Sequence, residues 1–371
     1  MNAPVIASLD HYLENGWSTI QFKDIEGWRS DNHLVAFECL KRSAFAQKNN
    51  EPLTRPGTVP SVGLQRLFSQ IATGEISCAT DFQALEFFEE YFTPLEIRPS
   101  QGFVTGYYEP EVAASRIQSK AFSVPLYARP DDLVDITDQN RPEGWPEDMV
   151  FGRKTSDGLA EYFNRGEIEA GALENRRLEL FWLPSFAEAF FIHVQGSARL
   201  KLEDGTITRV AYAGKSGHEY TSIGKLLIER GIVSAENASM QFLRNWISEN
   251  SQAGIELMRE NKSFIFFSEL TELGAELGPL AGAGVQLETR RSLAVDKSIH
   301  AYGTPVWIST ENPIGEETTP FYKLMVAQDT GSAIIGPQRG DLFIGSGLAA
   351  GEIAGTLRHD CRFIILFARE N

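Results

Sequence analysis

The sequence is short of the features that mark several large classes of protein. It has three cysteines in 371 residues, none in a C-x-x-C pair, and six histidines with no two spaced to share a face. We therefore expect no metal site and no other cofactor. No stretch approaches the roughly 18–20 apolar residues of a membrane-spanning helix, so we expect no transmembrane segment. The thiols of Cys39, Cys78 and Cys361 are expected to be free, with a Cys39–Cys78 disulfide as the alternative in an exported protein.

Positive charge is also scarce. The chain carries 34 basic and 50 acidic residues, a formal net charge of −16. Such a surface repels phosphate backbones and anionic lipid headgroups, so we expect no nucleic-acid partner, whereas a neutral polymer would not be repelled. The first seventeen residues lack the basic and apolar segments of an export signal. Either the protein is cytoplasmic or the sequence is a mature part whose leader has been removed.

The pattern that is present predicts two domains of mixed secondary structure. At 371 residues and 42% hydrophobic content, the chain can bury two cores. Apolar residues recur with helical spacing over 30–92 and 221–262, and with a period of two over 102–215 and from 263 to the end. The order of helices, strands, helices and strands favours a β-rich domain inserted into another domain.

Local signals support this assignment. Thr80 and Gln83 form a capping box at the start of a helix in which Phe82, Leu85 and Phe88 repeat with helical spacing. Asp204-Gly205 suits the tight turn of a β-hairpin. Gly231 is expected to end a helix that begins near residue 221.

Two fragments of familiar motifs fail at one position each. His218-Glu219 begins like the zinc motif H-E-x-x-H, but Ser222 occupies the place of the second histidine. Gly214-Lys215-Ser216 ends like a phosphate-binding loop, but Arg209 occupies the place of its first glycine. Neither a zinc enzyme nor a nucleotide-binding protein is expected.

Asp329-Thr330-Gly331-Ser332 matches the active-site loop of aspartic peptidases. In those enzymes two such loops bring two carboxylates together to share one proton, and this chain has one. An aspartic peptidase therefore stays open only as an alternative. Both Asp329 and Asp341 lie beside glycine, so a role limited to accepting hydrogen bonds in turns is open as well.

The segments around these aspartates occur with others in a characteristic order. They are 103–116 (FVTGYYEPEVAASR), 190–205, 211–231, 239–246, 293–308 (LAVDKSIHAYGTPVWI) and the stretch LMVAQDTGSAIIGPQRGDLFIGSGLAAGEIAG. This string resembles the MltA family of lytic murein transglycosylases, including its C-terminal 3D domain, named for three aspartates. Here those are Asp296, Asp329 and Asp341. The resemblance extends from about residue 100 to the end.

The resemblance implies a mainly β fold with flanking helices. A double-psi β-barrel domain would be built from residues 1–107 and 246–371, including the helical N-terminal part. A smaller β-barrel-like domain, residues 108–245, would be inserted into it to bind substrate, with a groove for a glycan strand between the two.

The resemblance also implies a reaction and the residues that perform it. Asp341 would be the catalytic acid and Asp329 its neighbour, with Asp296 structural. The enzyme would cleave the β-1,4 bond between N-acetylmuramic acid and N-acetylglucosamine in peptidoglycan and leave 1,6-anhydromuramic acid ends. Because free aspartate titrates near pH 4, Asp341 must lie where burial or a like charge, for which Asp329 is the candidate, disfavours its ionised form.

A glycan groove requires hydroxyl and amide groups beside flat apolar faces. On the resemblance, the candidate substrate-binding residues are Thr105, Tyr107, Tyr108, Gln195, Gly196, Ser197, Lys215 and Tyr220. We expect a monomer in the periplasm, with outer-membrane association left open, whose partners are peptidoglycan strands and cell-wall synthesis or scaffold proteins. A non-catalytic glycan-binding protein is the third hypothesis.

Overall fold

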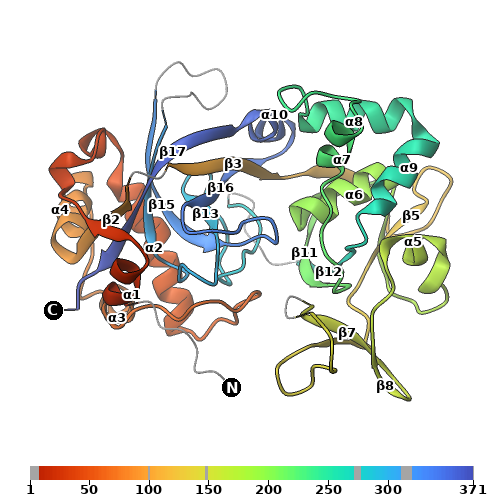
Figure 1. Cartoon of the computed structure of the whole chain (residues 1–371), viewed down its shortest axis with the longest axis horizontal. Coiled ribbons are helices and arrows are strands. Elements are labelled where there is room, and N and C mark those ends of the chain that lie inside the picture. The colour runs from red at the N-terminus through yellow and green to blue at the C-terminus, as the bar shows by residue number, and fades with distance from the viewer. Residues whose placement is uncertain (1–7, 99–100, 147–148, 271–276, 311–319, 371) are drawn as a thin grey trace. The chain divides into compact units, whose positions relative to one another are not determined.

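The computed structural model describes residues 8–98, 101–146, 149–270, 277–310 and 320–370. The chain divides into two compact units (Figure 1). The barrel unit comprises Asn2–Tyr108, Ala275–Gly345 and Ala349–Asn371, and the insert unit comprises Glu109–Gly274 and Ser346–Leu348. The sequence predicts an insert of 108–245; the insert unit continues past 245 because its last strand, β12 (Ile265–Leu270), pairs with β11 (Ile207–Lys215).

The barrel unit combines helices from the N-terminal part of the chain with strands from both ends. Its elements are α1 (Leu9–Glu14), β1 (Trp17–Thr19), η1 (Phe22–Asp24), η2 (Trp28–Ser30), α2 (His33–Lys48), α3 (Val62–Thr73), α4 (Asp81–Tyr91), β2 (Phe92–Ile97), β3 (Gly102–Glu109), β13 (Ser292–Val295), β14 (Pro305–Thr310), β15 (Phe321–Asp329), β16 (Arg339–Ser346), α10 (Leu348–Thr356) and β17 (Arg358–Ala368).

The strands of this unit close into a barrel. Their order is β1-β2-β17-β14-β15-β13-β16-β3. Strand β3 also pairs with β17, so the six strands from β17 to β3 in this order form a closed ring. The long strand β17 makes this closure possible, because its first residues pair with β3 and its last with β2. Apolar side chains such as Val104, Leu293, Val306, Ile344 and Phe363 fill one core of the unit.

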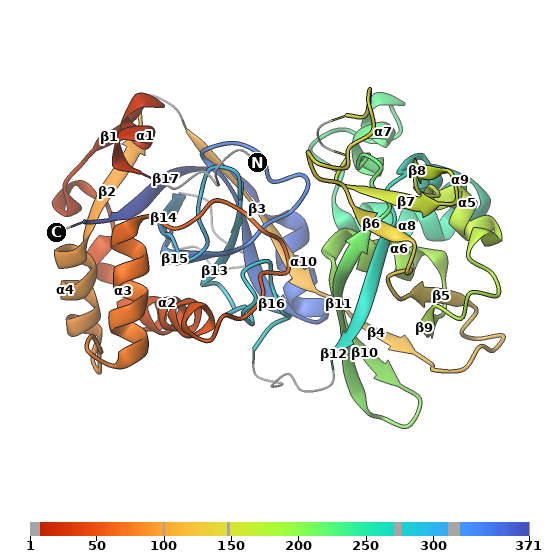
Figure 2. The same cartoon turned by 90° about the horizontal axis from the view of Figure 1, so that it is seen from below.

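Helices α2, α3 and α4 cover one side of this sheet (Figure 2). They pack on Trp307, Leu324 and Ile364, all 0% exposed. The predicted capping box is confirmed: Thr80 Oγ1 accepts from Gln83 N–H, and the Gln83 side chain accepts from the Thr80 N–H. One residue of the predicted apolar face of α4, Phe82, is not buried.

Phe82 is 64% exposed, and the buried aromatic face of α4 consists of Phe87 and Phe88. The buried face of α4 consists of Ala84, Phe87 and Phe88, and Phe82, two residues before Ala84, lies about 200° around the helix from Ala84. The spacing of Phe82, Leu85 and Phe88 is helical but drifts around the helix, so it does not by itself identify the buried face.

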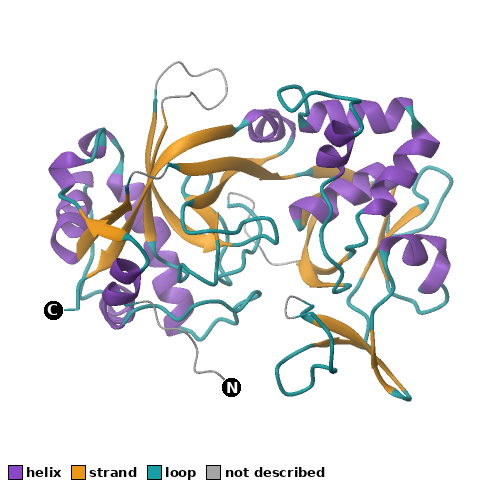
Figure 3. Ribbon diagram, viewed as in Figure 1, coloured by secondary structure: helices purple, strands orange, loops and turns teal. Residues whose placement is uncertain are grey.

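The insert unit is built from short strands flanked by helices (Figure 3). Its elements are β4 (Glu111–Ala114), β5 (Val124–Tyr127), β6 (Leu133–Asp135), β7 (Phe151–Thr155), β8 (Gly158–Ala160), α5 (Arg165–Glu167), η3 (Ile168–Ala172), β9 (Glu179–Leu183), α6 (Phe186–Gln195), β10 (Ser197–Leu202), β11 (Ile207–Lys215), α7 (Ile223–Glu229), α8 (Met240–Glu249), α9 (Ser251–Glu260) and β12 (Ile265–Leu270).

Six of these strands form a ring, as the prediction of a barrel-like insert requires. The sheet β12-β11-β10-β4 is joined to the pair β5-β9 by two single bridges, Ser115 to Trp182 and Ala128 to Phe267. The predicted hairpin is confirmed as β10 and β11, with Gly205 at a φ of 85° in its turn. Gly231, at a φ of 68°, follows α7 as predicted.

The three cysteines are free thiols, and Cys39 and Cys361 are buried. Among the residues that the structure describes, no helix has the combination of length and apolar character needed to cross a bilayer.

Candidate active site

Asp329 and Asp341 come together because one short strand lies between theirs. β13 pairs in parallel with β15 and antiparallel with β16, and Ala294 of β13 is in register with both aspartates. Residues in register on adjacent strands project from the same face of a sheet, and strands lie about 4.8 Å apart. The two carboxylates therefore lie on one face of the barrel, with the small side chain of Ala294 between them.

Several donors surround the Asp329 carboxylate. Oδ1 accepts from the Gly282 N–H at 2.9 Å, and Oδ2 accepts from the Tyr107 hydroxyl at 3.0 Å. The Arg55 guanidinium lies 4.0 Å from Oδ1 and donates to the carbonyl of the neighbouring Thr330. These contacts fix the position of the Asp329 carboxylate beside Tyr107 and Gly282.

Close packing fixes these donors in place. The Tyr107 ring lies 5.5 Å from the ring of Phe343, centroid to centroid. Burial and the nearby Asp329 raise the pKa of Tyr107 well above its usual value, so its hydroxyl stays a donor. A Cβ at position 282 would lie 2.6 Å from the Tyr302 hydroxyl and 3.3 Å from Asp329 Oδ1, so only glycine lets the backbone approach this closely.

The surroundings of Asp341 are poorer in donors. Its Oδ1 accepts one hydrogen bond, from Thr105 Oγ1 at 2.5 Å. Burial raises its pKa from 3.8 to about 6; the bond from Thr105 and the charge of Arg339 lower it, and the charge of Asp329 raises it again. Asp341 as a whole residue is partly exposed. Its carboxyl group thus combines a raised pKa with few hydrogen-bond donors.

The third aspartate, Asp296, holds the loop between β15 and β16. Its Oδ1 accepts from the backbone and hydroxyl of Ser298 at 3.0 and 2.6 Å, and its Oδ2 accepts from the Gly336 N–H at 2.8 Å. Gly336 has a φ of 114°, which favours glycine. Both oxygens are occupied by local structure, as a bracing role requires.

The three predicted substrate-binding residues of β3 differ in their surroundings. Thr105 and Tyr107 alternate along the strand and lie on the face that carries Asp341 and Asp329, to which their hydroxyls donate. Tyr108 is on the other face, 7% exposed, in the barrel core. Its ring packs so closely on Gly351 that a Cβ there would lie 2.8 Å from it, which leaves little of the ring for a sugar.

The other predicted substrate-binding residues belong to the insert unit. Gln195 is the last residue of α6 and Ser197, 6% exposed, the first of β10. Gly196 between them ends the helix with a φ of 77°, and its N–H donates to Ile192 O at 2.8 Å. A helix end thus explains this glycine without a ligand.

Lys215 and Tyr220 lie near the end of β11 and the loop that follows, both partly exposed. Burial raises the pKa of Tyr220.

Sequence reasoning missed two arginines. Arg339 stands two residues before Asp341, and the period of two in a strand puts both on one face, so this contact was open to prediction. Arg55 lies in the loop between α2 and α3, far from the other site residues in sequence, and no local signal marks it.

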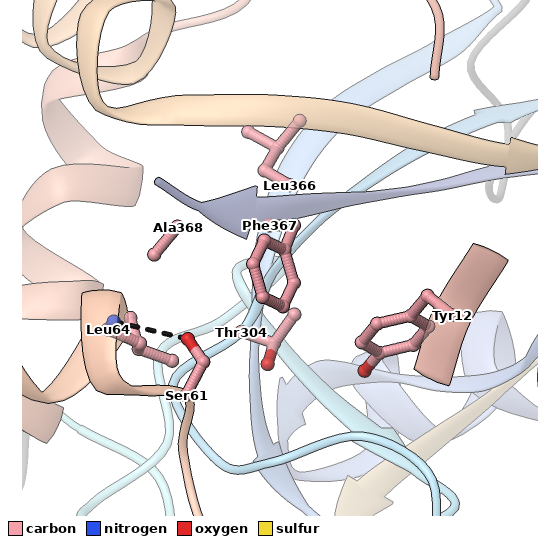
Figure 4. Close-up of a pocket in the computed structure, with 7 residues that line it drawn as sticks. All are labelled: Tyr12, Ser61, Leu64, Thr304, Leu366, Phe367 and Ala368. Carbon is pink, nitrogen blue, oxygen red and sulfur yellow. Dashed lines mark hydrogen bonds between the residues drawn. The ribbon is translucent and has the colours of Figure 1, made fainter. Parts of the chain in front are cut away.

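A small pocket also lies in the barrel unit, away from these carboxylates (Figure 4). It is about 10 Å³ in volume, lined by residues such as Tyr12, Thr304 and Phe367. That is about the room needed for one water molecule, not for a sugar ring. In the part of the chain that the structure describes, no three His, Cys, Asp or Glu side chains gather as metal ligands would.

Known families match both units. The MltA specific insert domain matches residues 103–268, and the 3D domain matches residues 291–367. The membrane-bound lytic murein transglycosylase A of Escherichia coli K12 is 36% identical over 270 residues, which are 71% of this chain and 64% of that protein. The match therefore spans a little less than two thirds of this relative.

Solved structures match over nearly the whole chain. A membrane-bound lytic murein transglycosylase from Agrobacterium tumefaciens is 38% identical with a TM-score of 0.88, covering 95% of this chain and 98% of that one. MltA from Neisseria gonorrhoeae is 28% identical with a TM-score of 0.77, covering 96% and 93%. E. coli MltA with bound chitohexaose is 26% identical with a TM-score of 0.66, covering 90% of each chain. These likenesses confirm the predicted fold class, and the chain belongs to the MltA family, with an MltA-specific insert and a 3D domain.

Proposed function

We propose that this protein is a lytic transglycosylase that cleaves the β-1,4 bond between N-acetylmuramic acid and N-acetylglucosamine in peptidoglycan, with Asp341 as its acid and base. One observation carries the proposal: Asp341 has a pKa of about 6 and lies in register, across Ala294, with a second carboxylate. Relatives named as lytic murein transglycosylases and an E. coli MltA structure with bound chitohexaose support the substrate class.

The first step is bond cleavage with proton transfer. Protonated Asp341 gives its proton to the glycosidic oxygen. The bond from C1 to that oxygen breaks, its electron pair goes to the oxygen, and the N-acetylglucosamine leaves with a free 4-hydroxyl. Positive charge develops at muramic C1, and Asp329 lies on the same face as Asp341. A carboxyl group with a pKa near the working pH suits this role, since it must both donate and recover a proton.

The second step closes the ring without water. Asp341, now a carboxylate, takes the proton from the muramic C6 hydroxyl, and O6 attacks C1 to form the 1,6-anhydro product. The substrate's own hydroxyl replaces the second carboxyl group that ordinary glycosidases require. Asp341 ends the cycle protonated, so no other acid or base is consumed.

The insert unit is proposed to bind the glycan. Gln195, Lys215 and Tyr220 offer amide, ammonium and hydroxyl groups, and each is partly exposed. Thr105 and Tyr107 stand at the carboxylates themselves. A net charge of −16 is compatible with a glycan backbone, which has no phosphate groups to repel.

The proposal locates the protein in the cell envelope, where peptidoglycan lies. Relatives from E. coli and Vibrio cholerae are named membrane-bound, and we propose the periplasm, with association to the outer membrane as the finer assignment. We propose a monomer that meets cell-wall synthesis or scaffold proteins on the murein layer.

Digestion of purified murein sacculi tests the function. The released fragments are analysed by mass spectrometry beside lysozyme digests, with Asp341→Asn as the inactive variant and Asp157→Asn, in an exposed turn, as its matched control. We expect muropeptides one water lighter than the lysozyme products from the unmodified protein and from Asp157→Asn. Reducing ends would show a hydrolase, cleaved stem peptides a peptidase, and binding without release a non-catalytic module; each contradicts the proposal.

A further inference from the structure

A chain of two hydrogen bonds ends on the Asp341 carboxyl group. Arg339 Nη2 donates to Thr105 Oγ1 at 2.6 Å, and Thr105 Oγ1 donates to Asp341 Oδ1 at 2.5 Å. Arg339 and Asp341 are two residues apart on β16, and Thr105 lies on the neighbouring strand β3. Arg339 is itself held: it donates to the Gly340 carbonyl, and its guanidinium lies 5.4 Å from the centre of the Phe103 ring.

The chemistry of these three groups favours one arrangement of protons. A guanidinium has only donors, and a hydroxyl has one proton and two acceptor sites. Thr105 Oγ1 accepts from the Arg339 guanidinium, which polarises the hydroxyl and makes it a better donor than acceptor, and Asp341 Oδ1 lies 2.5 Å away to receive its single proton. Accepting a second bond from a protonated Oδ1 would turn that proton away from Asp341, so Oδ1 is favoured as an acceptor in both protonation states of Asp341. The proton that Asp341 itself carries is left on Oδ2.

We propose that Arg339 and Thr105 act as a positioning relay that confines the transferable proton of Asp341 to Oδ2. Without Arg339, the Thr105 hydroxyl is no longer polarised toward donation and accepts more readily from a protonated Asp341, which would place the proton on Oδ1, on the side of β3. The use of this proton in catalysis rests on the proposed function. The position of the proton does not, since it is a property of the protein alone.

Arg339 affects Asp341 in two separate ways, through its charge and through the orientation that it gives the Thr105 hydroxyl. The charged or titratable groups that face Asp341 are Arg339 on its own strand, Asp329 on β15 and Tyr107 on β3, while β13 presents Ala294. Cys361 on β17 lies near Arg339, and burial raises its pKa to about 12, so it stays neutral. The charge of Arg339 lowers the pKa of Asp341 directly, and its hydrogen bond orients Thr105.

Infrared difference spectroscopy can read both contributions without substrate. The spectrum of Asp341→Asn is subtracted to isolate the carbonyl stretch of protonated Asp341, which is followed from pH 4 to pH 8. A carbonyl that accepts a hydrogen bond absorbs at a lower frequency than a free one. We expect Thr105→Val to move this band to higher frequency and Thr105→Ser, which keeps the hydroxyl, to leave it in place.

Variants of Arg339 separate charge from orientation. Arg339→Met is expected to raise the titration midpoint of Asp341 by about one pH unit and to move the band upward. Arg339→Lys keeps the charge but loses the planar fork, so the midpoint should stay near that of the unmodified protein while the band still moves. In Arg339→Met/Thr105→Val the band should move no further than in Thr105→Val alone, because Arg339 acts on it through Thr105.

Two results would overturn the relay. One is an unchanged band in Thr105→Val, which would mean that Oδ1 accepts nothing from Thr105. The other is a band in Arg339→Lys identical to that of the unmodified protein, which would mean that Arg339 acts on Asp341 only through its charge. The same proteins are assayed on murein sacculi, so an inactive unmodified protein with the expected spectra would refute the proposed function and leave the relay standing.

Discussion

Two carboxylates of this chain, Glu109 in the insert unit and Asp341 in the barrel unit, have opposite surroundings. Glu109 is 0% exposed and accepts from Arg199 Nε at 2.9 Å, Arg209 Nε at 3.0 Å and Ser346 Oγ at 2.7 Å. Two guanidinium groups thus offset its charge directly. Asp341 accepts one hydrogen bond from a neutral hydroxyl, and its arginine reaches it only through that hydroxyl.

The difference distinguishes a carboxylate tied into the structure from one that we propose to be reactive. A buried carboxylate that is paired and hydrogen-bonded on both oxygens holds the groups around it in place. A carboxyl group with too few donors for its burial shifts its pKa upward instead. Glu109 can therefore hold strands together, whereas the raised pKa of Asp341 fits the acid and base role that we propose for it.

The largest expected effect is on activity. Asp341→Asn keeps the shape and the hydrogen bond from Thr105 but has no proton to transfer, so we expect release of muropeptides to fall by about 10²–10⁴-fold. The release of muropeptides by Glu109→Gln, assayed under conditions in which this variant is folded, should fall much less. Equal losses in the two variants would erase the distinction between the two sites.

The next largest effect is on stability, and here we expect Glu109→Gln to lose more than Asp341→Asn. Glu109→Gln leaves two arginines without their counter-charge, and we expect it to lower the free energy of unfolding by about 3–5 kcal/mol in urea titrations. Asp341→Asn should not destabilise the fold. Glu86→Gln, on the exposed side of α4, is the matched control and should change little. A loss at Glu109 no larger than that of the control would contradict the structural role.

The pH dependence of stability sharpens the comparison. The pKa of Asp341 is raised from 3.8 to about 6 in the native state, so its contribution to stability is present below about pH 4 and is lost as pH rises through 6. Relative to Asp341→Asn, the unmodified protein should lose on the order of 2–3 kcal/mol between pH 4 and pH 7. A difference that stays constant, or that grows in favour of the unmodified protein, would show that this carboxyl group is not destabilised by burial.

The smallest effect concerns Tyr107. Tyr107→Phe removes the hydroxyl that donates to Asp329 but keeps the ring against Phe343. We expect kcat/KM for muropeptide release to fall about tenfold, equivalent to about 1.4 kcal/mol. A loss as large as that of Asp341→Asn would give the proton transfer to Tyr107 instead.

Local signals in the sequence predicted local structure well. The capping box at Thr80, the hairpin turn at Gly205 and the end of α7 at Gly231 each depend on a few neighbouring residues. The closure of the barrel through β17, and the register that places Ala294 between two aspartates, depend on pairings between distant strands. No single-sequence pattern encodes such a register.

The site residues divide in the same way. Asp329 and Asp341 were predicted from the motifs around them, and Thr105 and Tyr107 from their segment, and the structure brings these four side chains together. Arg55 was missed because a loop between two helices brings it to Asp329, and loops carry no periodicity to follow. Gly196, expected to approach a sugar, has a sufficient explanation in the end of α6.

The dependence of kcat/KM on pH tests the central claim most directly. If Asp341 must be protonated in the free enzyme, kcat/KM for muropeptide release should be highest below about pH 6 and fall tenfold for each pH unit above it. In Arg339→Met the fall should begin at a higher pH. An activity that rises through pH 6, or that does not change there, would mean that Asp341 acts only as a carboxylate and is not the acid.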